Sequence, residues 1–151
     1  WARQGSCNEE LLNNLNELDF FKIKKAKSIG RDYFENDFLF TLEKSTLQVS
    51  DILNTLVNHI AYQIAAVLNE NKLTDVFVTG GGAHNVFLME ILKKYYNGKI
   101  LIPDTITINY KEALIFALLG YLRLQEHTNT LSSVTGAKHN SVGGAVYFSG
   151  Q

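Results

Sequence analysis

The chain has 151 residues, 46% of them hydrophobic, and a formal net charge of −1. A chain of this length can bury about two thirds of its unfolded surface, which is enough for one domain with a core. The small net charge excludes a general electrostatic surface for nucleic acid or for an anionic membrane. Cys7 is the only cysteine, so an internal disulfide and a cysteine-based metal site are excluded, and the composition fits a reducing cytoplasm.

Neither a membrane span nor a secretory signal is expected. The longest strongly apolar run, Ala113 to Leu119, is too short to cross a bilayer, and the first five residues lack a charged start followed by an apolar segment. Because the sequence opens with Trp1 instead of Met, we expect further polypeptide upstream.

The first third of the chain predicts two helices joined by a loop. Ser6 or Asn8 can cap a first helix that ends near Asp19. Residues 22–30 show no sustained period and are expected to form a loop. A short helix should follow, with an aromatic face formed by residues spaced by four, Phe34, Phe38 and Leu42.

The longest predicted helix begins after Ser50, a good N-cap, and continues to about Asn69. His59 lies on it, but no second metal ligand stands at a neighbouring turn, so we expect a packed or surface histidine. Its inward face should be a wide apolar stripe made of Leu53, Leu56, Val57, Ile60, Ile64, Ala65 and Leu68.

A strand, a glycine turn and a helix are predicted next. The apolar run Val76 to Val78 meets Gly80, Gly81 and Gly82, and an amphipathic pattern starts at about Asn85 and ends near Tyr96. Glycines let another group approach the backbone closely, and a helix N-terminus has free N–H groups that favour phosphate. The turn matches neither a Walker A loop nor a dinucleotide fingerprint, so a connection that binds nothing is an open alternative.

The remaining pattern predicts a second parallel strand at Lys99 to Ile102, ended by Pro103, which would complete a right-handed βαβ unit. A buried helix should span about Tyr110 to Gln125, followed by a polar loop and a last strand at Gly144 to Phe148. The fold class is therefore α/β, with few strands flanked by about five helices. We expect the missing strands of the sheet to precede Trp1.

Four separated motifs, in this order, resemble the C-terminal half of the anhydro-N-acetylmuramic acid kinase family. The resemblance covers nearly the whole chain. Its motifs are Lys27 to Phe34, Thr79 to Asn85, Lys111-Glu112-Ala113 with Phe116-Ala117, and Val134-Thr135-Gly136-Ala137.

This resemblance implies a sugar kinase of the superfamily that includes actin and the heat-shock ATPases, in which two ribonuclease-H-like domains close over ATP. Residues 1–151 would be the C-terminal lobe, a partial ribonuclease-H-like domain, with the N-terminal domain absent. The implied reaction uses ATP and Mg²⁺ to convert 1,6-anhydro-N-acetylmuramic acid to N-acetylmuramic acid 6-phosphate in cell-wall peptidoglycan recycling. A cytoplasmic homodimer, with no nucleic acid or membrane partner, is also implied.

The resemblance assigns nucleotide contacts to the turn and a sugar contact to Glu112. No catalytic residue and no metal ligand are expected in this chain, so residues 1–151 alone should be inactive. The expected nucleotide-binding residues are Gly80, Gly81, Gly82, Ala83, His84 and Asn85.

Several alternatives are open. His84 could cap a helix or bond a neighbouring loop, and Glu112 could be a first-turn glutamate that complements the helix dipole. Lys27 and Arg31 could stabilise a loop or a dimer contact. The whole protein could be another carbohydrate kinase of the superfamily, or a non-catalytic nucleotide-binding or assembly module. An incomplete sheet would leave an edge or apolar face uncovered, which predicts self-association.

Overall fold

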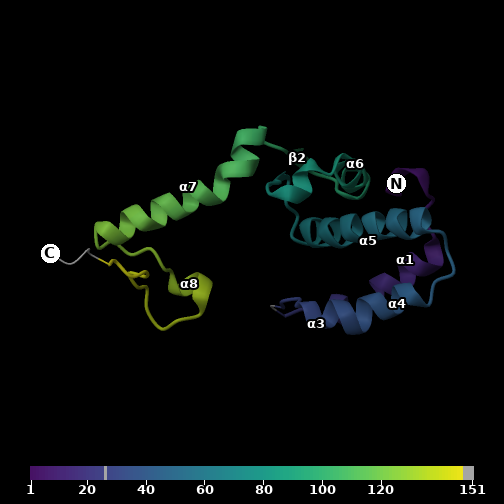
Figure 1. The fold of residues 1–151 in the computed structure, drawn as a ribbon, viewed down its shortest axis with the longest axis horizontal. Helices are drawn as coiled ribbons and strands as arrows, with labels where there is room; N and C mark the ends of the chain where they lie inside the picture. Colours follow the sequence, from purple (N-terminus) through teal and green to yellow (C-terminus); the bar gives the residue numbers. More distant parts are fainter. Residues whose placement is uncertain (26, 148–151) are drawn as a thin grey trace. The chain divides into compact units, whose positions relative to one another are not determined.

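The computed structural model describes residues 1–25 and 27–147. The chain divides into two compact units, Trp1 to Pro103 and the residues from Asp104 onward. Each unit is described by itself below. Figure 1 shows their helices and strands in sequence colours.

The first unit begins with a 3-10 turn, η1 (Ala2–Gln4), and two helices, α1 (Glu9–Asn16) and α2 (Asp19–Lys22). Of the two predicted caps, Asn8 is the one used, because its side chain accepts a hydrogen bond from the Leu11 amide at 2.8 Å. This bond satisfies one of the N–H groups that a helix start leaves without a partner.

The predicted aromatic helix is confirmed as a helical stretch in three parts, α3 (Arg31–Tyr33), a π-helical turn η2 (Phe34–Phe38) and α4 (Leu39–Glu43). The Phe34 and Phe38 rings stack with centroids 5.6 Å apart. Phe38 is buried against α1 and closes a first hydrophobic cluster, whose buried members are Leu11, Leu15 and Phe38.

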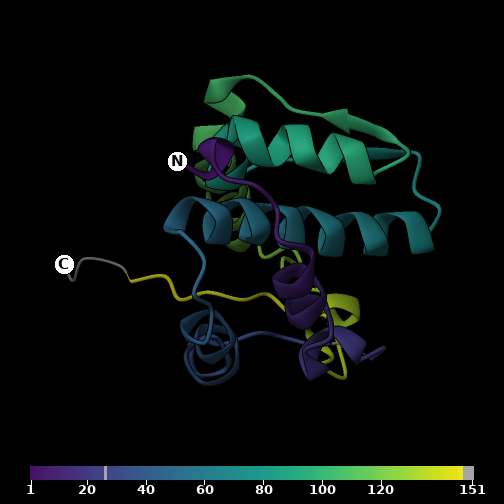
Figure 2. The same ribbon diagram turned by 90° about the vertical axis from the view of Figure 1, so that its right-hand side faces the viewer.

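Helix α5 (Val49–Glu70) is the longest element and lies between α1 on one side and α6 (Val86–Tyr95) on the other (Figures 1 and 2). The predicted Ser50 cap is wrong by two residues: Gln48 is the N-cap, its backbone is extended and its side chain makes no capping bond. Ser50 instead lies inside the first turn, where its backbone is in close contact with Gly5.

One side of α5 packs against α6 through small residues. Ala61 is fully buried and Ala65 is 2% exposed, and their short side chains let the two helices approach closely. The second hydrophobic cluster forms here, with buried members Ala61, Ala65, Met89, Ile91, Leu92 and Tyr96.

Part of the buried surface of α5 is polar, which the apolar pattern did not predict. Asn58 lies on the same side as Ala61 and accepts a hydrogen bond from the Tyr95 hydroxyl of α6 at 3.2 Å, whereas Thr55 and His59 lie toward α1. The Asn54 amide nitrogen donates to the carbonyls of Ala2 and Gly5 at 2.9 and 2.8 Å, and the Thr55 hydroxyl accepts from the Asn8 amide at 2.9 Å. The expected inward positions Ile60 and Ile64 are wrong, since these side chains are 43% and 40% exposed. The α5 polar seam, as we call it, comprises Asn54, Thr55, Asn58 and His59.

His59 completes this seam and is packed, as the isolated histidine predicted. Its Nδ1 lies 2.8 Å from Asn16 Oδ1, which also accepts from Gln63 Nε2 at 2.9 Å. Because an amide oxygen only accepts hydrogen bonds, His59 Nδ1 carries a proton in this contact. Burial, at 2% exposure and between the rings of Phe21 and Phe38, lowers the pKa of His59 to about 4.

The predicted βαβ unit is confirmed. Strand β1 (Asp75–Phe77) pairs in parallel with β2 (Lys99–Leu101), with Val76 opposite Ile100, and α6 is the crossover helix. Val76 and Ile100 face the second cluster, as the alternation of a strand requires. Their neighbours on the other face, Phe77 and Leu101, are 58% and 38% exposed. This two-stranded sheet is the only sheet within the described residues.

The second unit contains α7 (Thr105–Leu124) and a short helix, α8 (Ser132–Thr135). Helix α7 starts about five residues earlier than predicted, because the Asp104 carboxylate caps it by accepting from the Thr107 amide at 2.9 Å. Our expectation that it is buried is wrong: among its described residues only Ile108 is buried, so the described rest of the second unit does not cover its apolar side chains.

The structure after α7 also differs from the prediction. The expected polar loop at residues 125–140 contains α8 and an isolated antiparallel bridge between Thr130 and Ser141. The predicted strand Gly144 to Phe148 is absent at residues 144–147, and Phe148 lies outside the described residues. In the part of the chain that is described, no helix has both the length and the apolar character to span a membrane.

The neutral, buried His59 predicts a pH dependence of stability. Its folded pKa of about 4 is below the ordinary value of 6.5, so the unfolded chain takes up a proton first as the pH falls. The contribution of His59 to the free energy of unfolding should therefore be fully present above pH 6.5 and should be lost as the pH falls towards 4. Urea unfolding of wild type and His59→Gln between these pH values should show a shallower decrease for the variant.

Gln63→Ala is a matched control, because it removes another donor to the same Asn16 oxygen but keeps the imidazole. It should lower stability by a similar amount at every pH. Equal pH slopes for wild type and His59→Gln would show that the imidazole is not buried in its neutral form.

Candidate functional site

The glycine turn follows β1 at the carboxyl end of the parallel strands, the edge at which ligands bind in open α/β sheets. Gly80 has φ +84° and ψ 176°, a combination that is essentially restricted to glycine. Its carbonyl accepts from the Ala83 amide at 3.0 Å and closes a 3-10 turn, η3 (Gly81–His84). Gly80 is thus needed for the path of the backbone.

Gly81 and Gly82 are different, because nothing in the described chain requires them to lack side chains. Neither has a positive φ, and a Cβ built on either meets no atom of the described chain within 4 Å. Both residues are exposed. The absence of side chains at these two positions would let another molecule approach the backbone closely.

The amides of this turn are divided between internal bonds and an outward-facing set. The Asn85 amide donates to the Gly82 carbonyl at 3.1 Å, and the buried Ala83 turns toward the core. The amides of Val86 and Phe87, in the first turn of α6, have no acceptor within the helix. A helix start of this kind favours a negatively charged group, and at an exposed position the dipole of α6 contributes about 0.3–1 kcal/mol to that preference.

The structure separates the roles of His84 and Asn85. Asn85 Oδ1 accepts from the Leu88 amide at 3.0 Å, so Asn85 is the cap of α6 and its side chain is used in that bond. Asn85 is therefore the side-chain cap of α6, and the role of His84 stays a prediction. His84 is exposed at the end of η3, beside the bare backbone of the turn.

Glu112 lies in the second unit, on α7, and is exposed. The interpretation of Glu112 as a first-turn glutamate is wrong, because the helix begins at Thr105 and Glu112 stands two turns further on, beyond the range of the N-terminal dipole. The acidic residue at the start of α7 is its N-cap, Asp104, and hydrogen bonds from the Thr107 amide and hydroxyl lower the pKa of its carboxyl group.

Lys27 and Arg31 have local structural contacts. Lys27 Nζ donates to the Phe20 carbonyl at 2.9 Å and lies 4.7 Å from the centre of the Phe20 ring. Arg31 Nε donates to the Glu35 carboxylate at 2.6 Å, one helical turn along. Of the two roles that were open for this motif, these contacts support loop stabilisation.

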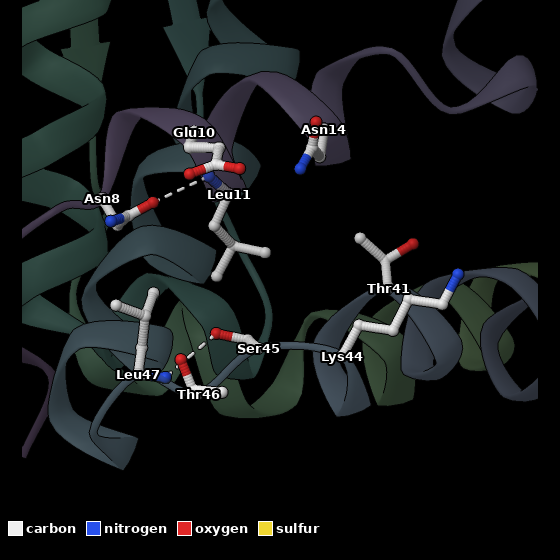
Figure 3. A pocket seen from close by; sticks show the side chains of 9 residues that line it. All are labelled: Asn8, Glu10, Leu11, Asn14, Thr41, Lys44, Ser45, Thr46 and Leu47. Atoms are coloured by element: carbon white, nitrogen blue, oxygen red, sulfur yellow. Dashed lines mark hydrogen bonds between the residues drawn. The ribbon is translucent and has the colours of Figure 1, made fainter.

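A polar cavity of about 290 Å³ was not predicted from the sequence (Figure 3). It lies between α1, which contributes Glu10 and Asn14, and the end of α4, which contributes Thr41 and Lys44. The Lys44 ammonium rests 3.8 Å from the centre of the Phe40 ring. None of the expected site residues lines this cavity, and no group of three or more potential metal ligands occurs among the described residues.

These observations define a strand-turn-helix at the carboxyl edge of an α/β unit, with exposed bare backbone at Gly81 and Gly82. The sequence model of the anhydro-N-acetylmuramic acid kinase family matches residues 1–149, and the chain belongs to this family. The expectation from the four motifs is confirmed.

Curated relatives carry the same name. The anhydro-N-acetylmuramic acid kinase of Hahella chejuensis is 40% identical over 97% of this chain and 41% of its own length. Those of Legionella pneumophila strain Lens and Rhodococcus erythropolis are 36% and 32% identical, over 97% and 94% of this chain. The chain spans about two fifths of the length of these relatives.

The two kinds of glycine in the turn predict opposite effects on stability. Gly80→Ala places a side chain at φ +84° and should destabilise the fold by about 1–3 kcal/mol. Gly82→Ala has an ordinary φ and open space, so stability should stay unchanged or rise by about 0.4–1 kcal/mol. Urea unfolding of the two variants measures the difference, and a large loss in Gly82→Ala would mean that the fold itself requires this glycine.

Proposed function

We propose that this chain is the C-terminal lobe of an ATP-dependent kinase that converts 1,6-anhydro-N-acetylmuramic acid to N-acetylmuramic acid 6-phosphate in peptidoglycan recycling. Family membership over residues 1–149 supports the activity. The observation that carries the proposal in the structure is the open backbone of Gly81 and Gly82 at the carboxyl edge of the sheet, since a kinase needs a surface for phosphate at such an edge.

In this proposal the βαβ unit is part of a ribonuclease-H-like domain of the actin-like ATPase superfamily. Two features support this. The sheet has only two strands within the described residues, and its apolar face at Phe77 and Leu101 is exposed, whereas parallel sheets are normally covered on both faces. A second domain of the whole protein would supply the catalytic carboxylate and most contacts to Mg²⁺.

The nucleotide would lie against the turn. Gly81 and Gly82 let it approach the backbone, the first amides of α6 donate to a phosphate oxygen, and exposed His84 lies beside the ribose or the α-phosphate. Ala83 and Asn85 contribute indirectly, the first by anchoring the turn in the core and the second by capping α6. One helix dipole is weak, so the other lobe must supply the remaining binding energy.

The sugar would be contacted by Glu112, which is exposed on α7 and can accept hydrogen bonds from hydroxyl groups. In the reaction, the γ-phosphoryl group passes from ATP to O6 of the sugar. Water adds to C1 as the bond from C1 to O6 breaks, and a carboxylate of the other lobe takes the proton from that water. Mg²⁺ would neutralise phosphate charge when bound.

We also propose that the whole protein is a cytoplasmic homodimer with no nucleic acid or membrane partner. A lone half-buried thiol, Cys7, and the small net charge support a reducing compartment and small-molecule substrates.

A chimera tests the function. When this chain replaces the matching segment of the Hahella chejuensis kinase, the hybrid should phosphorylate 1,6-anhydro-N-acetylmuramic acid with a kcat/KM within about ten-fold of the parent, equal to about 1.4 kcal/mol. Residues 1–151 alone should show no turnover. Coupled assay of ADP release, with mass spectrometry of the product, measures both.

Two substitutions in the chimera test the site. Glu112→Gln should lower kcat/KM at least ten-fold, because the amide accepts hydrogen bonds less strongly. Glu43→Gln, an exposed glutamate on α4, is the matched control and should change nothing. A well-folded chimera that releases no ADP with this sugar would contradict the proposed function, and equal rates for both variants would remove Glu112 from the site.

A further inference from the structure

A second cavity, of about 400 Å³, lies within the second unit and has no place in the proposed kinase reaction. One wall is a face of α7 that carries Phe116, Gly120 and Arg123 at a helical spacing. The opposite wall is the turn at Gly143 and Gly144. A cavity of this size falls within the range of small-molecule sites in proteins.

The walls are held in place by a hydrogen-bonded side chain. Asn129 Oδ1 accepts from the Gly143 amide at 2.6 Å, while its Nδ2 donates to the carbonyls of Gly143 and Leu119, each at 3.1 Å. This side chain therefore ties the glycine turn to α7. The cavity is formed before any ligand arrives, which lowers the entropic cost of binding.

The middle of the helical wall is a glycine, Gly120, although an α-helix favours a residue with a side chain. Gly120 lies inside α7, where glycine costs about 0.5–1 kcal/mol relative to alanine. A Cβ built on it meets no atom of the described chain within 4 Å, so the described packing does not require glycine. The missing side chain leaves a flat strip of helix beside the Phe116 ring, which is 70% exposed.

Arg123 places positive charge at the end of this strip. Its Nε donates to the Gly144 carbonyl at 2.9 Å, which fixes the plane of the guanidinium group. Because Gly144 takes only the Nε proton, the terminal nitrogens keep four N–H donors in the geometry that suits a carboxylate. No ion pair to Arg123 occurs among the described residues.

We propose that this cavity binds a small planar aromatic carboxylate, whose ring lies on Phe116 and Gly120 and whose carboxylate pairs with Arg123. The exposed ring offers a stacking partner, the bare helix offers room for a flat group, and the oriented guanidinium selects an anion. None of the residues that line this cavity is an expected nucleotide- or sugar-binding residue, although Glu112 stands one turn before Phe116 on α7.

Naphthoate is a suitable probe, and naphthylmethanol is its uncharged analogue. In a titration of ¹⁵N-labelled protein of residues 1–151, naphthoate should shift the amide signals of Gly120, Gly143 and Gly144 in a saturable way. Naphthylmethanol should bind at least ten-fold more weakly, because it lacks the carboxylate that pairs with Arg123.

Matched variants separate this site from general binding to apolar surface. Arg123→Gln should weaken naphthoate at least ten-fold, whereas Arg31→Gln, which removes an equal charge from α3, should leave binding unchanged. Gly120→Leu should abolish binding by filling the strip, while Ala117→Leu adds the same bulk to α7 outside the lining residues and should not.

Three results would overturn the proposal. They are the absence of saturable shifts in the glycine signals, equal affinity for the charged and uncharged probes, and equal affinity of wild type and Arg123→Gln. Circular dichroism of each variant confirms that α7 is intact.

Discussion

The polar seam of α5 is the interaction on which the first unit depends. Asn54 and Thr55 bond the backbone of the N-terminal segment, and His59 bonds Asn16 at the end of α1. A buried donor or acceptor that loses its partner costs about 1–3 kcal/mol, so each of these bonds fixes the segment more firmly than apolar contact alone would. Ala61 lies one turn beyond Asn58 on the same face of α5, and α6 packs closely against it.

This arrangement positions the candidate site. Helix α6 is held by α5 from below and by the strands through Val76 and Ile100, so its N-terminus and the preceding turn have a fixed support. The support explains how an exposed turn with bare glycines can be ordered without internal packing at Gly81. A second contact, the bidentate pair of Arg3 with Glu90 at 2.6 and 3.1 Å, ties η1 to the exposed side of α6.

Local patterns were sufficient to predict the βαβ unit, because strand, glycine turn and amphipathic helix each have a strong signal over few residues. Apolar spacing could not predict which face of α5 is buried, since that face includes polar side chains and Ile60 is exposed. The spacing of four between Asn54 and Asn58, and between Thr55 and His59, was the signal that could have revealed it. The burial of α7 and a strand at residues 144–147 were predicted wrongly, because apolar composition cannot show which surface an apolar side chain packs against. The turn was found from its glycines, whereas the distinction between Gly80 and Gly82 needed backbone angles and surrounding space.

We propose that the bare backbone at Gly81 and Gly82 receives the phosphates of ATP. A crystal structure of the active chimera with a non-hydrolysable ATP analogue would show where the phosphates lie. We expect phosphate oxygens within hydrogen-bonding distance of the amides in this turn or at the start of α6. An analogue bound in the catalytic cleft with its phosphates far from residues 80–87 would contradict it.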